Sequence, residues 1–323
     1  MNSSNTNKTQ KYGMPFKEVG RLLQKEPAEW ISLLPSNDNQ PPLGSGAKLS
    51  PQIMRALLVS LGVPFSAQIL AFMNLKGGVG KTTSSITIAT RAVQYGFKTC
   101  ILDLDAQASA TLAFGVELKE SDSIFYDIWQ SPHDEVAGAI VEIEEYLHIL
   151  PSALENSLLD VSLINPVAQK KAVQGVCDVL RTLGFDVIII DCPPSLGAAV
   201  ISTACAADTI TIPAGVDAYS FKGIELILDE IKSIRQTFGL GEVDIRILPT
   251  KLDRRQNLTQ TALNKLTENY KDLLLPISIG ASSSFSKALE RCETIFASSQ
   301  KNQAKTDYDL TTQILLGLNK LFK

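Results

Sequence analysis

The segment that most constrains this chain is a glycine-rich loop between a short apolar run and a helical pattern. It reads Lys-Gly-Gly-Val-Gly-Lys-Thr-Thr over residues 76–83 and follows a β-rich run at residues 69–75. Glycines permit a tight turn whose backbone N–H groups point inward, and the helix N-terminus behind the turn attracts anions. A strand, this loop and a helix in succession predict a phosphate-binding site in an α/β fold.

The residues of this loop have defined expected roles. Lys81 is expected to reach the β and γ phosphates of a nucleotide, and the Thr82 hydroxyl is expected to ligate Mg²⁺. The usual spacing G-x-x-x-x-G-K-[ST] is not met, because Leu75 stands where the first glycine belongs, and an additional lysine, Lys76, stands at the loop entrance. The expected nucleotide-binding residues are Gly77, Gly78, Val79, Gly80, Lys81, Thr82 and Thr83.

Two later segments end apolar runs in carboxylates. Asp103 and Asp105 close the run that begins at residue 100, and they share one face if the strand continues that far. Asp191 follows the continuous apolar run at residues 187–190 and would hold Mg²⁺, usually through water. An apolar run before an aspartate is a weak signal alone, since a helix N-cap looks the same. Its position after the loop and the first acidic segment strengthens the prediction of a nucleotide site.

Together these segments resemble the ParA/MinD family of dimeric ATPases, whose deviant Walker A motif has the form KGGVGKTT. Residues 100–111 are similar to the DxDPQ-x-x-AT segment of ParA proteins, with Ala106 where the family usually has proline. The resemblance covers about residues 67–323. It implies ATP and Mg²⁺ as cofactors and a slow, partner-stimulated hydrolysis of ATP. It also implies that Asp105 positions or polarises the attacking water, whereas Asp103 lies nearer the metal or is structural.

The resemblance further implies how the protein assembles. In that family the lysine at the position of Lys76 crosses the interface of an ATP-bound homodimer to the partner's nucleotide, where a cation stabilises the transferred phosphoryl group. ParA proteins bind DNA non-specifically as ATP dimers, and a ParB-like centromere-binding protein stimulates them. Such binding needs cations that contact phosphates rather than bases. The candidate DNA contacts are Lys251, Arg254, Arg255 and Lys287.

Charge is distributed unevenly along the 323 residues. The net charge of −4 divides into +3 for residues 1–66, −12 for residues 67–245 and +5 for residues 246–323. Basic ends are typical of a surface for nucleic acid or anionic lipid, although ordinary solvated helix faces give the same counts. Apolar residues make up 45%, which excludes global disorder. Five scattered cysteines without a CxxC pair, and a polar N-terminus without a secretory signal, favour a cytoplasmic protein. The resemblance further implies that it is associated with the nucleoid.

The pattern along the chain predicts two parts. Residues 67–323 alternate strands with helices, which predicts a doubly wound, mostly parallel sheet of the P-loop NTPase type. Residues 1–66 are expected to form a short helical extension with a linker near residues 35–47. Within it, residues 1–15 are expected to be disordered, residues 16–34 have helical spacing, and Ser50 is the expected N-cap of a helix that ends near Gly62.

Two segments leave alternatives open. Residues 50–64 could be half of an operator-binding helix-turn-helix or a helix that braces the dimer. Residues 310–322 carry an apolar stripe like the membrane-binding helix that ends MinD-type relatives, but a closing helix packed on the core has the same pattern. Only Lys320 and Lys323 flank the stripe, so core packing is favoured and membrane binding is not expected.

The sequence therefore predicts an ATP-hydrolysing DNA partition protein that segregates or positions a plasmid or chromosome. One alternative is a MinD-like membrane-cycling regulator, and another is a ParA-like ATPase that positions a protein cargo on the nucleoid. An Fe–S reductase is disfavoured because no two cysteines lie at plausible cluster-bridging positions. A metabolic kinase of the same fold is disfavoured because it would give Lys76 no role.

Overall fold

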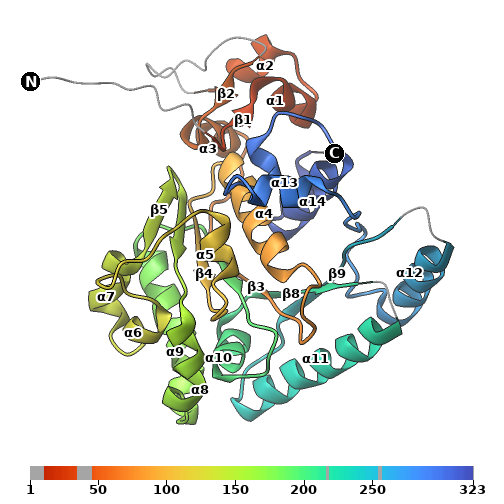
Figure 1. Ribbon diagram of the computed structural model, residues 1–323. Coiled ribbons are helices and arrows are strands. Elements are labelled where there is room, and N and C mark those ends of the chain that lie inside the picture. The colour runs from red at the N-terminus through yellow and green to blue at the C-terminus, as the bar shows by residue number, and fades with distance from the viewer. Residues whose placement is uncertain (1–10, 35–45, 216–217, 254–256, 323) are drawn as a thin grey trace, which may run out of the picture.

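The computed structural model describes residues 11–34, 46–215, 218–253 and 257–322 (Figure 1). Within this part of the chain, seven strands form one sheet in the order β5-β6-β4-β7-β3-β8-β9. Neighbouring strands are parallel except for the antiparallel pair β5 and β6. The strands are β3 (Gln68–Phe72), β4 (Thr99–Asp103), β5 (Val141–Glu144), β6 (Leu147–Leu150), β7 (Val187–Asp191), β8 (Thr209–Ala214) and β9 (Asp244–Pro249).

Helices connect these strands and cover the sheet. The α-helices are α4 (Lys81–Gln94), α5 (Ser109–Ala113), α6 (Phe125–Ile128), α7 (Pro132–Ala139), α8 (Leu159–Ser162), α9 (Pro166–Thr182), α10 (Ala198–Ala206), α11 (Ala218–Thr237), α12 (Asn257–Tyr270), α13 (Ser284–Leu289) and α14 (Gln303–Leu315). Short 3₁₀ helices are η1 (Leu154–Leu158), η2 (Ile295–Ala297) and η3 (Leu318–Lys320). The chain starts near the middle of the sheet at β3 and reaches both edges, so the predicted doubly wound, mostly parallel α/β fold is confirmed.

The central strand β7 shows why this sequence needs helices on both faces. Ile188 and Ile190 point into a core shared with α9, α10 and α11, whereas Val187 and Ile189 point into a second core shared with α4 and α14. Successive side chains of a strand alternate between faces, so a continuous apolar run is stable only when both faces are covered. Figure 1 shows these two helical layers on opposite sides of the sheet.

The N-terminal extension is built from short elements: β1 (Met14–Pro15), α1 (Phe16–Leu23), α2 (Pro27–Ile31), β2 (Lys48–Leu49) and α3 (Pro51–Ser60). The expected disorder is wrong for the described residues 11–15, because Met14 is fully buried and β1 pairs antiparallel with β2. The helical spacing of residues 16–34 does not give one helix. Gln24 adopts a left-handed conformation with φ of 52°, and Pro27 then starts α2.

Helix α3 matches its prediction at both ends. The Ser50 hydroxyl accepts a hydrogen bond from the Ile53 backbone at 3.3 Å, and Gly62 turns the chain with φ of 81°. No second helix follows before β3 in the described residues 61–67, so α3 is not the first helix of a helix-turn-helix. The two alternatives for residues 50–64, operator binding and bracing of the dimer, stay predictions. The helix pair joined by a short turn is instead α1 and α2, which are separated by three residues, 24–26.

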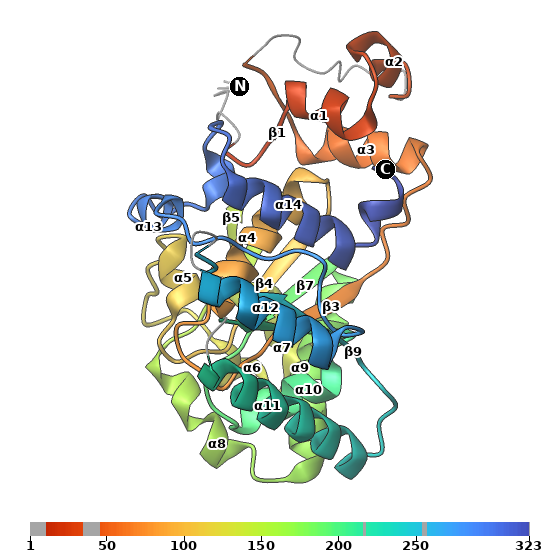
Figure 2. The same cartoon turned by 90° about the vertical axis from the view of Figure 1, so that its right-hand side faces the viewer.

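The extension and the C-terminal helix pack on the same side of the sheet. Trp30, Met54 and Leu57 share an apolar core with α4 and with Tyr308 of α14. Figure 2 shows α1 and α3 lying over α14. Leu316 and Leu318 are buried in this core while Leu310 is exposed, so most of the C-terminal apolar stripe is used for packing. In the described part of the chain no helix has the length and hydropathy needed to span a bilayer. A domain boundary at residues 66 and 67 remains a prediction.

Candidate nucleotide-binding site

Strand register brings the predicted site together at one edge of the sheet. In the parallel pairing, Asp191 at the end of β7 lies opposite Phe72 at the end of β3 and opposite Asp103 at the end of β4. The loop of residues 73–80 leaves β3 at this same edge and enters α4. Ligands of doubly wound sheets bind at the carboxyl ends of such strands, so the phosphate loop and both buried aspartates belong to one site.

The backbone of the loop explains two of its glycines. Gly78 and Gly80 have φ values of 71° and 95°, a region that side chains with a Cβ rarely adopt. Gly80 is also the N-cap residue of α4, so the start of this helix faces the loop. Gly77 and Gly78 are exposed and Val79 is buried. The loop therefore has an open side on which a phosphate can approach the backbone.

Two residues that the sequence analysis missed hold the loop in place. The Asn74 side chain donates to the Pro213 carbonyl at 2.7 Å and accepts from the Lys76 backbone N–H at 2.9 Å. The Thr250 hydroxyl donates to the Val79 carbonyl at 2.7 Å. Asn74 therefore fixes the loop entrance to β8, and Thr250 fixes its far end to β9. No sequence signal marked Asn74, whereas Thr250 lies next to the predicted candidate Lys251.

The two lysines of the loop have different surroundings. The Lys81 side chain is buried, and its ammonium donates to the Lys76 carbonyl at 3.4 Å, across the loop. Burial lowers the pKa of Lys81, and the nearby Asp191 carboxylate opposes that effect. Lys76 is exposed at the loop entrance. Lys81 therefore faces the enclosed part of the site, whereas Lys76 lies where it can contact another molecule.

Asp191 has one carboxylate oxygen without a protein partner. The residue is fully buried, its Oδ1 accepts from the Ser85 hydroxyl at 3.0 Å, and its Oδ2 has no hydrogen-bond partner among the described residues. Burial and the charge of Asp103 raise the pKa of Asp191 to about 7, although hydrogen bonds from Thr82 and Ser85 oppose the rise. A buried, unpartnered oxygen beside a threonine hydroxyl fits the oxygen ligands and retained waters of Mg²⁺. Ser85 was not predicted as a site residue.

The two aspartates of the first acidic segment do different things. Strand β4 ends at Asp103, so Asp105 lies beyond the strand and the two do not share a strand face. Both Asp103 oxygens are occupied: the backbone N–H groups of Asp105 and Thr111 donate to them, as does the Thr111 hydroxyl at 2.8 Å. Burial raises the pKa of Asp103 to about 6. This geometry favours the structural role for Asp103.

Asp105 remains accessible to the site. It is half-buried, and its Oδ1 accepts from the Gln107 backbone at 3.0 Å. Its own carbonyl accepts from the Ser152 hydroxyl at 2.7 Å, which ties this turn to the segment after β6. This hydrogen bond holds the turn at the position where ParA proteins usually have proline and this chain has Ala106. Ser152 was not predicted.

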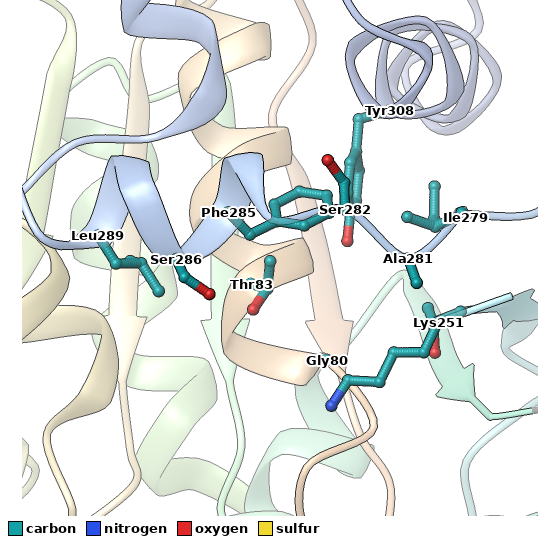
Figure 3. A pocket seen from close by; sticks show the side chains of 12 residues that line it. Gly80, Thr83, Lys251, Ile279, Ala281, Ser282, Phe285, Ser286, Leu289 and Tyr308 are labelled. Atoms are coloured by element: carbon teal, nitrogen blue, oxygen red, sulfur yellow. The ribbon is translucent and has the colours of Figure 1, made fainter. Parts of the chain in front are cut away.

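A cavity of about 310 Å³ adjoins the phosphate loop at Gly80 and Thr83. Phe285 of α13 and Tyr308 of α14 line its far wall, and the Lys251 side chain extends toward the loop (Figure 3). The volume lies in the range of small-ligand pockets, and apolar walls next to a phosphate site suit a nucleoside. The cavity is therefore the candidate site for the rest of the nucleotide.

The proposed DNA contacts divide into three groups. Lys251 lies on the cavity wall beside the phosphate loop, with φ of 58°, so its position favours the nucleotide rather than DNA. Lys287 is exposed on α13. Arg254 and Arg255 lie outside the described residues. The four predicted positions are thus not shown to form one surface.

The chain is similar to known proteins over the segment that contains the phosphate loop and both aspartates. The family model described as AAA domain matches residues 67–247. The chain is 27% identical to the sporulation initiation inhibitor protein Soj of Bacillus subtilis over 205 residues, which are 64% of this chain and 81% of Soj. It is 24% identical to the chromosome partitioning protein ParA of Caulobacter vibrioides over 207 residues, 64% of this chain and 77% of that protein. It is 26% identical to the cell division protein PomZ of Myxococcus xanthus over 239 residues, 73% and 74% of the two chains.

Two solved structures have the same fold. Apo McdA of Cyanothece has a TM-score of 0.67 at 21% identity, over 78% of this chain and 100% of that chain. Cobyrinic acid a,c-diamide synthase of Mycobacterium smegmatis, with a bound ATP analogue and magnesium, has a TM-score of 0.66 at 25% identity, over 77% of this chain and 94% of that chain. A nucleotide and magnesium are therefore bound in a protein to which this chain is similar.

Proposed function

The chain belongs to the AAA domain family and is a ParA-type P-loop ATPase, and from this premise we propose that it binds ATP with Mg²⁺ and hydrolyses it slowly. The observation that carries the proposal is the unpartnered Oδ2 of buried Asp191, close to the start of α4 and the phosphate loop. A carboxylate is retained at such a position only when something compensates its charge. Mg²⁺ bound to the nucleotide phosphates is that partner.

Each residue of the site then has a task. The backbone N–H groups of residues 77–80 and the Lys81 ammonium hold the β and γ phosphates. Thr82 and Asp191 would hold Mg²⁺, which would supply positive charge to the phosphate oxygens. Asp105 orients the attacking water, because its carboxylate is accessible while that of Asp103 is occupied by Thr111. Thr83 and the cavity beyond it bind the remainder of ATP.

Dimerisation would couple ATP binding to a change of surface. Lys76 is exposed at the mouth of the site, so in an ATP-bound homodimer it can reach the partner subunit's nucleotide. A cation supplied in this way stabilises the transferred phosphoryl group and is worth roughly 10³-fold in rate.

We expect Lys76→Ala to bind ATP and to lose hydrolysis, measured as phosphate release and as nucleotide affinity on the same preparation. Lys119→Ala, which removes an exposed lysine elsewhere, is the control. Hydrolysis at the wild-type rate in Lys76→Ala would falsify the trans-acting role.

The cellular task that follows is partition. The ATP dimer binds DNA non-specifically in the cytoplasm and on the nucleoid, and a ParB-like centromere-binding partner stimulates hydrolysis and release, which moves or positions a plasmid or chromosome. The relation to PomZ, a cell division protein, favours a second candidate, a ParA-like ATPase that positions a protein cargo. Identification of the bound partner by pulldown separates the two.

One binding assay tests the proposal. Purified protein is offered random-sequence duplex DNA or anionic liposomes, each with ATP, ADP or no nucleotide. Retention on DNA with ATP alone is expected. Retention on liposomes alone would replace the proposal with that of a MinD-like membrane-cycling regulator.

A further inference from the structure

A groove with a volume of about 550 Å³ lies between the N-terminal extension and the C-terminal helix, and its acids pair with Arg91 near the C-terminal end of α4. One wall comes from α1, and the other comes from the segment of residues 299–306 that leads into α14. In Figure 2, α1 and α3 lie above α14. The groove is therefore assembled from parts of the chain that are almost 300 residues apart and lies outside the region that the family model matches.

Cations stand on both walls of this groove. Lys17 and Arg21 are four residues apart on α1, which places them on one face of the helix. Lys301 precedes α14, and Lys305 lies in its first turn. Lys17, Arg21 and Lys301 are exposed, and none of the three forms a salt bridge with a residue that the structure describes.

The acidic residues of the groove form ion pairs with a buried arginine of α4. Glu18 and Asp309 are its two lining acids, and both bind the fully buried Arg91 of α4, at 2.6 and 2.7 Å. Arg91, which cannot reach the surface, offsets one of these two negative charges. The four lining cations exceed the one negative charge that remains, so the groove has a net positive charge and attracts anions.

Lys305 adds an independent sign of an anion site. Its side chain is held in the wall, where the ammonium donates to the Ser298 carbonyl. Burial lowers the pKa of Lys305 to about 8, and the Glu18 carboxylate only partly opposes this effect. An anion in the groove would supply the compensating charge that this ammonium lacks.

We propose that this groove binds the phosphate backbone of DNA, with Lys17 and Arg21 on one side and Lys301 and Lys305 on the other. Most of its lining side chains are charged, amide or hydroxyl groups, whereas pockets for small organic ligands are lined mainly by apolar side chains. The inference rests on the proposed function, since it locates the contact that the DNA-bound state needs.

The test compares two triple variants of the full-length protein. Lys17→Gln, Arg21→Gln and Lys301→Gln together remove the exposed groove cations, and Lys119→Gln, Lys265→Gln and Lys271→Gln remove three exposed lysines elsewhere. Affinity for random-sequence duplex DNA is measured with ATP at several salt concentrations, and basal ATP hydrolysis reports on folding. The groove variant should lose at least about tenfold in affinity, and its log–log salt slope should fall by about one unit per contact. The control variant should keep most of its affinity.

The outcomes separate the inference from the function beneath it. If wild-type protein binds DNA with ATP and the groove variant binds equally well, the groove is wrong and the proposed function stands. Loss of binding in an Arg254→Ala, Arg255→Ala variant alone would likewise place the DNA contact outside the groove. If the wild-type protein hydrolyses ATP and never binds DNA, the DNA step of the function and the groove both fail. If pyrophosphate binds in the groove but substitution of the groove cations leaves the DNA affinity unchanged, the inference is also wrong.

Discussion

The two ends of α4 are built in opposite ways. At its N-terminal end, Gly80 and Lys81 belong to one continuous motif, and the Ser85 hydroxyl donates to Asp191. At its C-terminal end, Arg91 is fully buried and binds Glu18 of α1 and Asp309 of α14. These partners are 73 and 218 residues away along the chain.

This difference separates chemistry that is local in sequence from chemistry that only the tertiary structure creates. The N-terminal end needs backbone N–H groups and a lysine at fixed spacing, so its residues are adjacent. At the C-terminal end a buried guanidinium needs a carboxylate to offset its charge and acceptors for its N–H groups, and these can come from anywhere in the chain. The phosphate loop leads into one end of α4, and the N-terminal extension and α14 bind the other end. These two elements therefore hold in place the helix that carries the phosphate loop.

The largest effect on stability should come from removing the ion pairs at the C-terminal end of α4. Arg91→Met keeps a long apolar stem but leaves Glu18 and Asp309 without their cation, and breaking a buried ion pair costs about 3–5 kcal/mol. We expect that loss in the free energy of unfolding, measured by chemical denaturation. ATP affinity below the unfolding transition should change much less, because Arg91 lies three turns from the phosphate loop.

Arg181 provides the matched control for this prediction. It pairs with Asp178 and Asp208 on the surface, where all three side chains are substantially exposed, so Arg181→Met should cost at most about 1 kcal/mol. Equal losses in the two variants would mean that the Arg91 cluster does not hold the extension to α4. Asp309→Asn, which keeps hydrogen-bonding groups, gives a milder second test if Arg91→Met fails to fold.

A smaller effect is expected at the N-terminal end. Ser85 donates to Asp191 Oδ1, and such a hydrogen bond to a charged group contributes about 1.5–3 kcal/mol. Ser85→Ala should therefore raise the Mg²⁺ concentration needed for half-maximal ATP hydrolysis by roughly tenfold. Neighbouring Ser84 bonds the Tyr308 hydroxyl at 2.9 Å instead, so Ser84→Ala should lose stability without changing the Mg²⁺ dependence. The same Mg²⁺ dependence in both variants would contradict the metal role of Asp191.

The same contrast explains how much could be predicted from sequence. Continuous apolar strands, the alternation with helices and the glycine spacing predicted the sheet, and the structure brings residues 77–83 and Asp191 together at its edge. The β5–β6 hairpin and α9 were not predicted, although all three lie between the first and last motifs. Their hydrophobic patterns are ordinary, and no fixed chemistry marks them.

The missed site residues share one physical cause. Asn74, Ser85, Ser152 and Thr250 act by hydrogen bonds to groups that are 106 to 171 residues away, or 47 for Ser152. A hydroxyl or amide side chain has many possible partners, so its type does not reveal which one the fold supplies. Lys251 is a similar case: the sequence marked it as a cation of a basic segment, whereas the fold turns it toward the phosphate loop. The DNA contacts as a set stay predictions.

The smallest predicted effect extends the comparison to the groove beside Arg91. Lys305 faces Glu18 of α1, Arg91 of α4 and Lys48 of β2, and its pKa of about 8 lies below the ordinary value of 10.5. Its ammonium is therefore charged at pH 7 and largely neutral at pH 9, while DNA phosphates stay charged throughout. DNA affinity of the wild-type protein should fall over this range by roughly the threefold to tenfold that one phosphate contact supplies. Lys305→Arg keeps its charge, because a guanidinium does not titrate there, and should remove that fall while Lys48 and Glu18 remain common to both proteins. Parallel pH profiles for the two proteins would show that Lys305 does not contact DNA and that the groove ends at the exposed cations.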